Sequence, residues 1–303
     1  NPRTHAFWGD ILPPVSAVIE DRVTPFILPS PERPLPPPLL RLENAACGYG
    51  GPPILRRMDL RLDIDDRIGL LGVNGAGKST FAKLVAGALT VESGKLHRSS
   101  RLRVGWFHQH QIEAMDPTDT PLEIIRRALP EETEAKRRAR LAQFGLSYEK
   151  VETTVANLSG GERARLLLNL VAMEAPHLLI LDEPTNHLDI DSRRALLEAL
   201  NDYEGAVLII THDRSLMELV ADQLWFTRDG TIVPFEGDMD DYAKLVLDRA
   251  RQAAKGQANT PNANGLTGKE ARKAAAAARQ RIAPLKMAAE ALERKMEAIA
   301  RSE

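Results

Sequence analysis

The sequence GVNGAGKST occupies residues 72–80 and fits the pattern of a glycine, four residues and then Gly-Lys-Ser. Its glycines let successive backbone N–H groups turn inward around phosphate oxygens. The apolar run at residues 67–71 predicts a buried strand before this loop, and residues 78–89 have the apolar spacing of a helix after it. This order places a helix N-terminus under a bound anion and predicts a nucleotide site. The predicted phosphate-binding residues are Gly72, Val73, Asn74, Gly75, Ala76, Gly77, Lys78, Ser79 and Thr80.

A second motif, further along the chain, supplies two carboxylates. The apolar run at residues 178–181 predicts a buried strand, and Asp182 and Glu183 follow it. We expect Asp182 and Ser79 to bind Mg²⁺, and Lys78 to contact the β- and γ-phosphates. Glu183 is expected to polarise the attacking water. A surface Asp-Glu pair is the alternative interpretation, and it is less favoured because both motifs occur in one chain.

A third motif, LSGGE at residues 158–162, opens a helical run. It resembles the signature of ATP-binding-cassette (ABC) ATPases, in which it binds the γ-phosphate of a nucleotide held by the opposing domain. The resemblance implies a nucleotide-binding role for Ser159, Gly160, Gly161 and Glu162, with ATP as the nucleotide. The alternative is a serine N-cap, and both can hold because a helix N-terminus with bare glycine N–H groups is an anion site.

Three further positions match this family in order. Gln109, after a strand-like run, resembles the glutamine that senses Mg²⁺ and the attacking water. His212 resembles the switch histidine that contacts the γ-phosphate, and Tyr49 resembles the aromatic that stacks on adenine. Any of the three taken alone would be interpreted as an ordinary polar or packing residue.

The loop after Glu183 reads PTNHLD at residues 184–189. This sequence resembles the corresponding loop of the ABC-F class, whose members carry two cassettes on one chain and act on ribosomes. The resemblance covers roughly residues 13–303 and implies the second cassette of such a protein, with no departure at the catalytic positions. It implies an ABC-type P-loop NTPase core of α/β class with an antiparallel β edge and an inserted helical subdomain.

Composition divides the chain into four regions. Residues 1–38 are rich in proline and predict the tail of an interdomain linker, in which residues 1–12 match nothing familiar. Residues 39–250 suffice for one cassette, with residues 119–172 as its helical subdomain. Residues 251–267 predict a flexible linker, and residues 268–303 predict the start of a coiled-coil C-terminal extension. We therefore expect a fragment whose first cassette is missing.

Charge and cysteine content indicate which partners and which structural features to expect. The chain has 303 residues, with 40 basic and 42 acidic side chains, and from Arg251 onward 11 are basic and 5 acidic. A basic helix suits ribosomal RNA phosphates, although a solvated coiled-coil face is an equal alternative. Cys47 is the single cysteine, so no disulfide framework is expected. No apolar run reaches the roughly 20 residues of a membrane span.

These observations favour a cytoplasmic ABC-F ATPase that acts with a second cassette and binds the ribosome. The alternatives are the ATPase subunit of an ABC transporter and a nucleotide-binding module without turnover. The PTNHLD loop and the basic C-terminal region argue against a transporter subunit. The complete set of catalytic residues argues against the inactive module.

Overall fold

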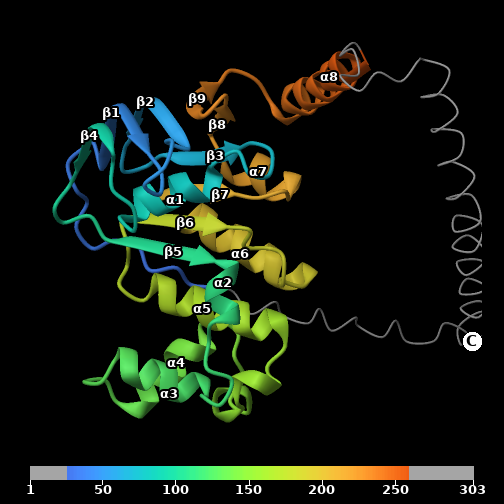
Figure 1. Cartoon of the computed structure of the whole chain (residues 1–303). Coiled ribbons are helices and arrows are strands. Elements are labelled where there is room, and N and C mark those ends of the chain that lie inside the picture. Colours follow the sequence, from blue (N-terminus) through green and yellow to red (C-terminus); the bar gives the residue numbers. More distant parts are fainter. Residues whose placement is uncertain (1–25, 259–303) are drawn as a thin grey trace, which may run out of the picture. The chain divides into compact units, whose positions relative to one another are not determined.

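The computed structural model describes residues 26–258. Contacts divide the chain into a unit of residues 1–240 and a second unit from residue 241 onward. The described part of the first unit is an α/β fold with two sheets (Figure 1). This architecture agrees with the predicted α/β core that carries an antiparallel β edge.

The smaller sheet is antiparallel and has the strand order β2-β1-β4. The larger sheet has the order β5-β6-β7-β3-β8-β9 and is parallel except for its last strand. The strands are β1 Leu40–Cys47, β2 Leu55–Leu62, β3 Arg67–Leu71, β4 Ser93–Arg98, β5 Val104–His108, β6 Leu178–Asp182, β7 Ala206–Ile210, β8 Gln223–Arg228 and β9 Thr231–Phe235.

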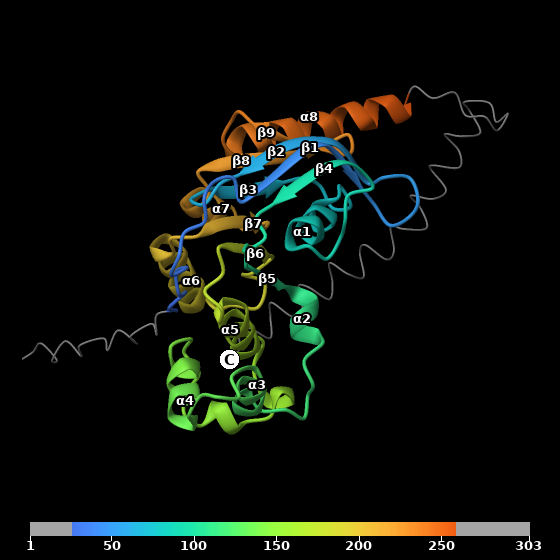
Figure 2. The same ribbon diagram turned by 90° about the vertical axis from the view of Figure 1, so that its left-hand side faces the viewer.

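The central strands β6 and β7 are almost entirely apolar because helices cover both faces of the larger sheet. Helix α1, Lys78–Ala86, lies between the two sheets, whereas α6, Ile190–Asp202, and α7, Arg214–Val220, lie on the opposite face (Figure 2). One buried cluster joins α1 to both sheets, and a second joins α6 to the other face. The strands β3, β6 and β7 are parallel, so their carboxyl ends meet at one edge of the larger sheet. Helices support that edge from both faces of the sheet.

The helical subdomain has its own buried core (Figure 1). It contains α3 Pro121–Ala128, α4 Glu134–Ala142, the 3₁₀ turns Lys150–Glu152 and Val155–Asn157, and α5 Gly160–Ala172, and it follows the short helix α2 Gln109–Glu113. Helices α3 to α5 span residues 121–172, and the subdomain range of residues 119–172 stays a prediction.

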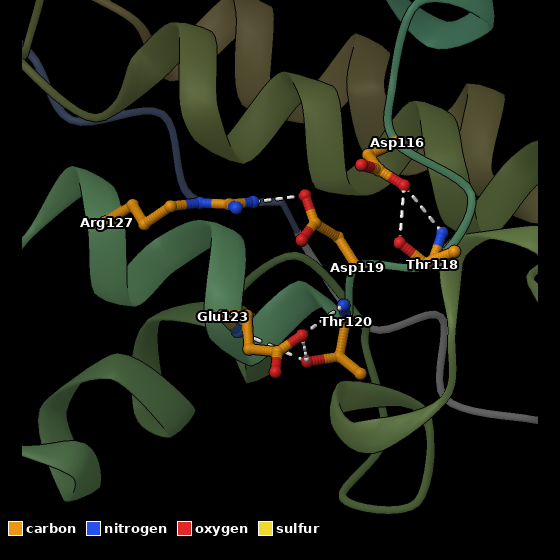
Figure 3. Close-up of polar contacts among 6 residues, drawn as sticks. All are labelled: Asp116, Thr118, Asp119, Thr120, Glu123 and Arg127. Carbon is orange, nitrogen blue, oxygen red and sulfur yellow. Dashed lines mark hydrogen bonds and ion pairs between the residues drawn. The ribbon is translucent and has the colours of Figure 1, made fainter.

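The entrance to this subdomain is fixed by local hydrogen bonds (Figure 3). Thr120 and Glu123 form a capping box, in which the Thr120 N–H donates to Glu123 Oε2 over 2.9 Å. Arg127 pairs with Asp119, and the Thr118 hydroxyl donates to Asp116. The first turn of α3 is thus held by side chains of the chain that enters it.

Residues 26–38 are predicted to belong to the tail of an interdomain linker, and in the structure they pack on the cassette. Phe26, Leu28 and Leu35 are buried against the cassette, so this stretch is packed on the domain rather than suspended beside it. The proline content that predicted a spacer is compatible with an extended segment that packs through the apolar side chains between the prolines.

Helix α8, Met239–Ala258, also differs from the predicted boundaries because it continues into the predicted flexible linker of residues 251–267. The predicted coiled coil of residues 268–303 lies outside the described residues. Between residues 26 and 258, no helix is both long and apolar enough to cross a membrane.

Candidate nucleotide-binding site

A cleft of about 530 Å³ opens at the carboxyl ends of the central strands. It brings together the loop after β3, the end of β6 and the end of β7, which are far apart in the sequence. Its lining residues are Ile54, Asn74, Gly75, Gly77, Lys78, Ser79, Thr80, Asp182, Glu183, Asn186, Ile210 and His212. The edge of a parallel sheet where strands end is the usual ligand site of α/β folds.

The loop between β3 and α1 follows the geometry that its glycines predict. Gly75 and Gly77 adopt left-handed backbone angles, with φ of 79° and 101°. A Cβ at Gly77 would approach Leu55 to 2.8 Å, so a side chain there would disturb the core below the loop. The loop therefore needs glycine for both its turn and its close packing.

Lys78 bends back over this loop. Its Nζ donates to the carbonyl oxygens of Gly72 and Val73, over 2.6 and 3.1 Å. Burial lowers the pKa of the Lys78 ammonium, and the nearby carboxylates of Glu183 and Asp182 act against this effect. The ammonium is thus held near the carboxylates and within reach of anything seated in the loop.

The two carboxylates after β6 have different surroundings. Asp182 is the last residue of the strand, and burial, followed by the neighbouring charge of Glu183, raises its pKa. Glu183 has a left-handed backbone with φ of 52°, and its N–H donates to the Ile210 carbonyl on the next strand over 2.8 Å. This conformation is costly for a residue with a side chain, and such positions cluster at functional sites.

His212 lies beside Glu183. Its Nε2 is 3.6 Å from Glu183 Oε1, and its backbone N–H donates to Oε2 over 3.4 Å. The hydroxyl of Thr211 approaches the same Oε2 at 3.5 Å. The ends of β6 and β7 therefore orient the Glu183 carboxylate toward the cleft.

Gln109 and Tyr49 do not line the cleft. Gln109 begins α2, and its Oε1 accepts a hydrogen bond of 3.5 Å from Asn186, which does line it. Tyr49 is 57% exposed, and Lys83 Nζ lies 5.1 Å from the centre of its ring. The structure therefore joins Gln109 to the site through a side chain and leaves Tyr49 at the surface.

The signature residues also lie away from the cleft, since none of residues 159–162 lines it. Ser159 caps α5 and forms a capping box with Glu162, whose Oε2 accepts from the Ser159 N–H over 2.8 Å. Lys150 pairs with Glu162 over 3.1 Å. The N-cap interpretation is thus confirmed, and it leaves the N–H groups of Gly160 and Gly161 at a helix start.

Besides the apolar residues Ile54 and Ile210, two polar residues contribute to the site without having been predicted from the sequence. Asn186 bridges the cleft to Gln109, and Thr211 approaches Glu183. Each stands close to a residue that was identified, three positions after Glu183 and one before His212. Both residues follow the end of a buried strand, and that position is the signal that could have identified them.

Fold and sequence together define an ATP-binding cassette of the ABC ATPase class. The family described as "ABC transporter" matches residues 55–186. The dimeric structure of a post-hydrolysis state of the cassette MJ0796, bound to ADP and Pi, superposes with a TM-score of 0.56 at 20% identity, covering 65% of this chain and 99% of that one.

The chain belongs to the ABC-F family of ATP-binding-cassette proteins. It is 43% identical to "Probable ATP-binding protein YheS" of Escherichia coli over 249 residues, covering 82% of this chain and 39% of that protein. It is 38% identical to "ABC transporter F family member 3" of Arabidopsis thaliana, covering 78% of this chain and 33% of that protein. The chain thus spans between a third and two fifths of the length of these relatives.

Proposed function

We propose that this chain is an ATP-hydrolysing cassette that works as one half of a pair and acts on ribosomes. The observation that carries the proposal is the separation of two sets of residues. Lys78, Asp182, Glu183 and His212 share one cleft, whereas the signature at residues 158–162 lies outside it. A cassette with this arrangement needs the signature of a second cassette to complete its site.

The oxygen atoms available in the cleft suit Mg²⁺. Mg²⁺ prefers a carboxylate, hydroxyl oxygens and phosphate oxygens in octahedral geometry. Asp182 and Ser79 both line the cleft and provide the first two, and Gln109 reaches it through Asn186. Bound Mg²⁺ would neutralise charge on the phosphates. It would also offset the cost of burying the charged Asp182 carboxylate.

Glu183 is proposed to orient and polarise the attacking water. His212 and Thr211 hold its carboxylate on the cleft side, as described above. Lys78 is proposed to bind the β- and γ-phosphates, because it is the one lysine or arginine among the described residues that line the cleft. Tyr49, exposed beside α1, is proposed to stack on the adenine ring.

An action on ribosomes is proposed because of the PTNHLD sequence after Glu183 and the basic residues from Arg251 onward. A cytoplasmic location follows from that proposal. The competing function is the ATPase subunit of an ABC transporter, which would leave ribosomes unbound.

Co-sedimentation with ribosomes separates these two functions. We would express the protein from its own gene with Glu183→Gln, which keeps nucleotide binding but removes the carboxylate needed for turnover. With ATP present, this variant is expected to sediment with ribosomes at several times the level of the wild type. Adding Lys78→Ala to the same protein is the matched control, and it should abolish ATP-dependent sedimentation because it removes the phosphate-binding charge.

The transporter function would be supported if the Glu183→Gln protein bound ATP and yet stayed off the ribosomes. Loss of ATP binding in the Glu183→Gln variant would contradict the role given to Glu183 instead. Measuring nucleotide binding on the same samples keeps the two outcomes apart.

A further inference from the structure

The segment before β1 makes specific contacts with the helix that carries the signature. Phe26 is 3% exposed, and its ring stacks on Phe144 with centroids 5.9 Å apart. The Arg165 guanidinium carbon lies 5.9 Å from the centre of the same ring. Phe144 follows α4 in the helical subdomain, and Arg165 lies on α5, so one side chain of the entering segment contacts both.

Arg165 is the centre of a wider set of contacts. Its Nη1 donates to the Gly145 carbonyl over 3.2 Å, next to Phe144. Its Nε donates to the Ser192 hydroxyl over 3.1 Å, and its Nη2 lies 3.7 Å from Asp189 Oδ1. A single guanidinium therefore joins the signature helix, the helical subdomain and the start of α6.

The start of α6 leads back to the nucleotide cleft. Ser192 is 1% exposed, and its N–H donates to Asp189 Oδ1 over 2.8 Å, which caps α6. Asp189 ends the PTNHLD loop that begins directly after Glu183. The position of Arg165 thus affects both the helix of the signature and the loop that follows the proposed catalytic carboxylate.

The rest of the segment is anchored on the core of the cassette. The Ser30 hydroxyl accepts a hydrogen bond of 3.1 Å from the Glu204 N–H, and the Arg33 carbonyl lies 3.1 Å from His177 Nε2. Leu28 is buried in the cluster around α6, and Leu35 is buried in the cluster around α1. Residues 28–35 thus fix the segment to the core, and Phe26 reaches the subdomain from that anchored base.

We propose that Phe26 is a positioning residue, which holds Arg165 between the Phe144–Gly145 turn and the start of α6. It thereby sets the signature helix relative to the loop after Glu183. A displacement of the chain before Phe26 would release the signature helix while leaving the phosphate-binding loop intact, because that loop is supported by the other buried cluster. The effect on turnover rests on the proposed function, but the positioning itself does not.

Amide hydrogen exchange of the nucleotide-free full chain tests the positioning directly. With Phe26→Ala, exchange in the first turns of α5 and around Phe144 is expected to rise about tenfold, because a stacked pair and a cation–π contact are lost together. Exchange in α1 should stay at the wild-type rate. Phe26→Tyr keeps the ring and should restore wild-type protection.

Two further variants separate positioning from packing. Leu28→Ala removes a buried side chain of the same segment and the same cluster, while the contacts of Ser30 and Arg33 still anchor the segment. It therefore serves as the matched control and should leave α5 near the wild-type rate. Arg165→Lys keeps the charge but loses the planar fork, and it should reproduce the Phe26→Ala pattern. The proposal would be overturned if exchange in α5 stayed unchanged in Phe26→Ala and in Arg165→Lys. It would also be overturned if exchange in α1 rose as much as in α5, or if Leu28→Ala raised exchange in α5 as much as Phe26→Ala does.

Turnover provides the second measurement. In the protein expressed from its own gene, Phe26→Ala should lower kcat several-fold and leave the Kd for ATP unchanged, since the phosphate loop is untouched. A rise in Kd of the same size would contradict positioning. If the wild type itself showed no turnover, the ATPase proposal would fail while the exchange measurements would still decide the role of Phe26.

Discussion

Lys78 and Asp182 carry opposite charges in one cleft, and burial disfavours the charged form of both. Burial lowers the pKa of Lys78 and raises the pKa of Asp182, and for Asp182 the adjacent Glu183 adds to the shift. The cleft therefore holds a set of charges that are incompletely compensated by one another. Phosphates and a divalent cation would supply the missing compensation.

This imbalance predicts how stability depends on Asp182. A carboxyl whose pKa is raised by folding binds its proton more tightly in the folded chain, so its contribution to stability falls as the pH rises from its ordinary value, 3.8, through the raised value. At neutral pH the charged Asp182 is destabilising. Asp182→Asn should then raise the Tm of the nucleotide-free chain by roughly 2–4 °C.

Thermal unfolding from about pH 4 to about pH 8 checks this sign. The difference in Tm between the variant and the wild type should be largest at neutral pH and should shrink as Asp182 becomes protonated in acid. Asp202→Asn changes an exposed aspartate on α6 and is the control. Equal Tm values at neutral pH would mean that burial does not burden the Asp182 carboxylate.

At the scale of single elements, helix α5 combines a structural cap with a proposed ligand site. Ser159 accepts from the Glu162 N–H over 3.2 Å, and losing an N-cap side chain typically costs about 1 kcal/mol. Thr133 caps α4 in the same subdomain by accepting from the Lys136 N–H. The two caps are therefore comparable in structure but only one belongs to the signature.

Replacing each cap by alanine separates the two roles of Ser159. Ser159→Ala and Thr133→Ala should each lower the free energy of unfolding by about 1 kcal/mol in urea titrations. Only Ser159→Ala should also weaken ATP-dependent pairing of cassettes, measured by sedimentation in a Glu183→Gln background. Equal pairing in both variants would limit Ser159 to its structural cap.

The sequence predicted the elements that form the cleft because their patterns are local. Buried parallel strands are continuous apolar runs, and the runs at residues 67–71 and 178–181 both form strands of the larger sheet. Helix α1 ends at Ala86, because its C-cap Gly87 has a left-handed φ of 85° that stops a helix predicted from apolar spacing to reach residue 89. Such boundaries depend on one glycine rather than on a period.

Other elements gave a weaker signal. Strand β4, Ser93–Arg98, is mostly exposed and carries few apolar residues, so its pairing with β1 supports it more than its own sequence does. The docking of Phe26 was also missed, because its partners Phe144 and Arg165 are distant in the sequence. Contacts of this kind are tertiary and leave no periodic trace.

At the scale of the whole molecule, the cassette is built around three buried clusters, and the proposed active site depends on more than one of them. The phosphate loop rests on the cluster around α1, and the signature helix packs in the clusters around α6 and in the helical subdomain. Motion of the subdomain would therefore move the signature without disturbing the bound nucleotide. A nucleotide held between two cassettes would therefore respond to subdomain motion in the cassette that supplies the signature.

A mixing experiment tests the shared site in this chain. Lys78→Ala should prevent nucleotide binding but leave the signature intact. Gly160→Asp should place a negative charge at the start of α5 and repel phosphate. The new Cβ would meet His187 at 3.5 Å, which is an ordinary contact, so the fold should survive.

Each variant alone is expected to show no turnover at any concentration. In an equal mixture, half of the pairs combine the two variants, and each mixed pair has one complete site, made of the Gly160→Asp phosphate loop and the Lys78→Ala signature. Turnover should then return to about a quarter of the wild-type level for a symmetric pair. Wild-type turnover should rise faster than linearly with chain concentration, because pairing is second order. An inactive mixture, with a wild-type rate strictly proportional to concentration, would show that each cassette completes its own site.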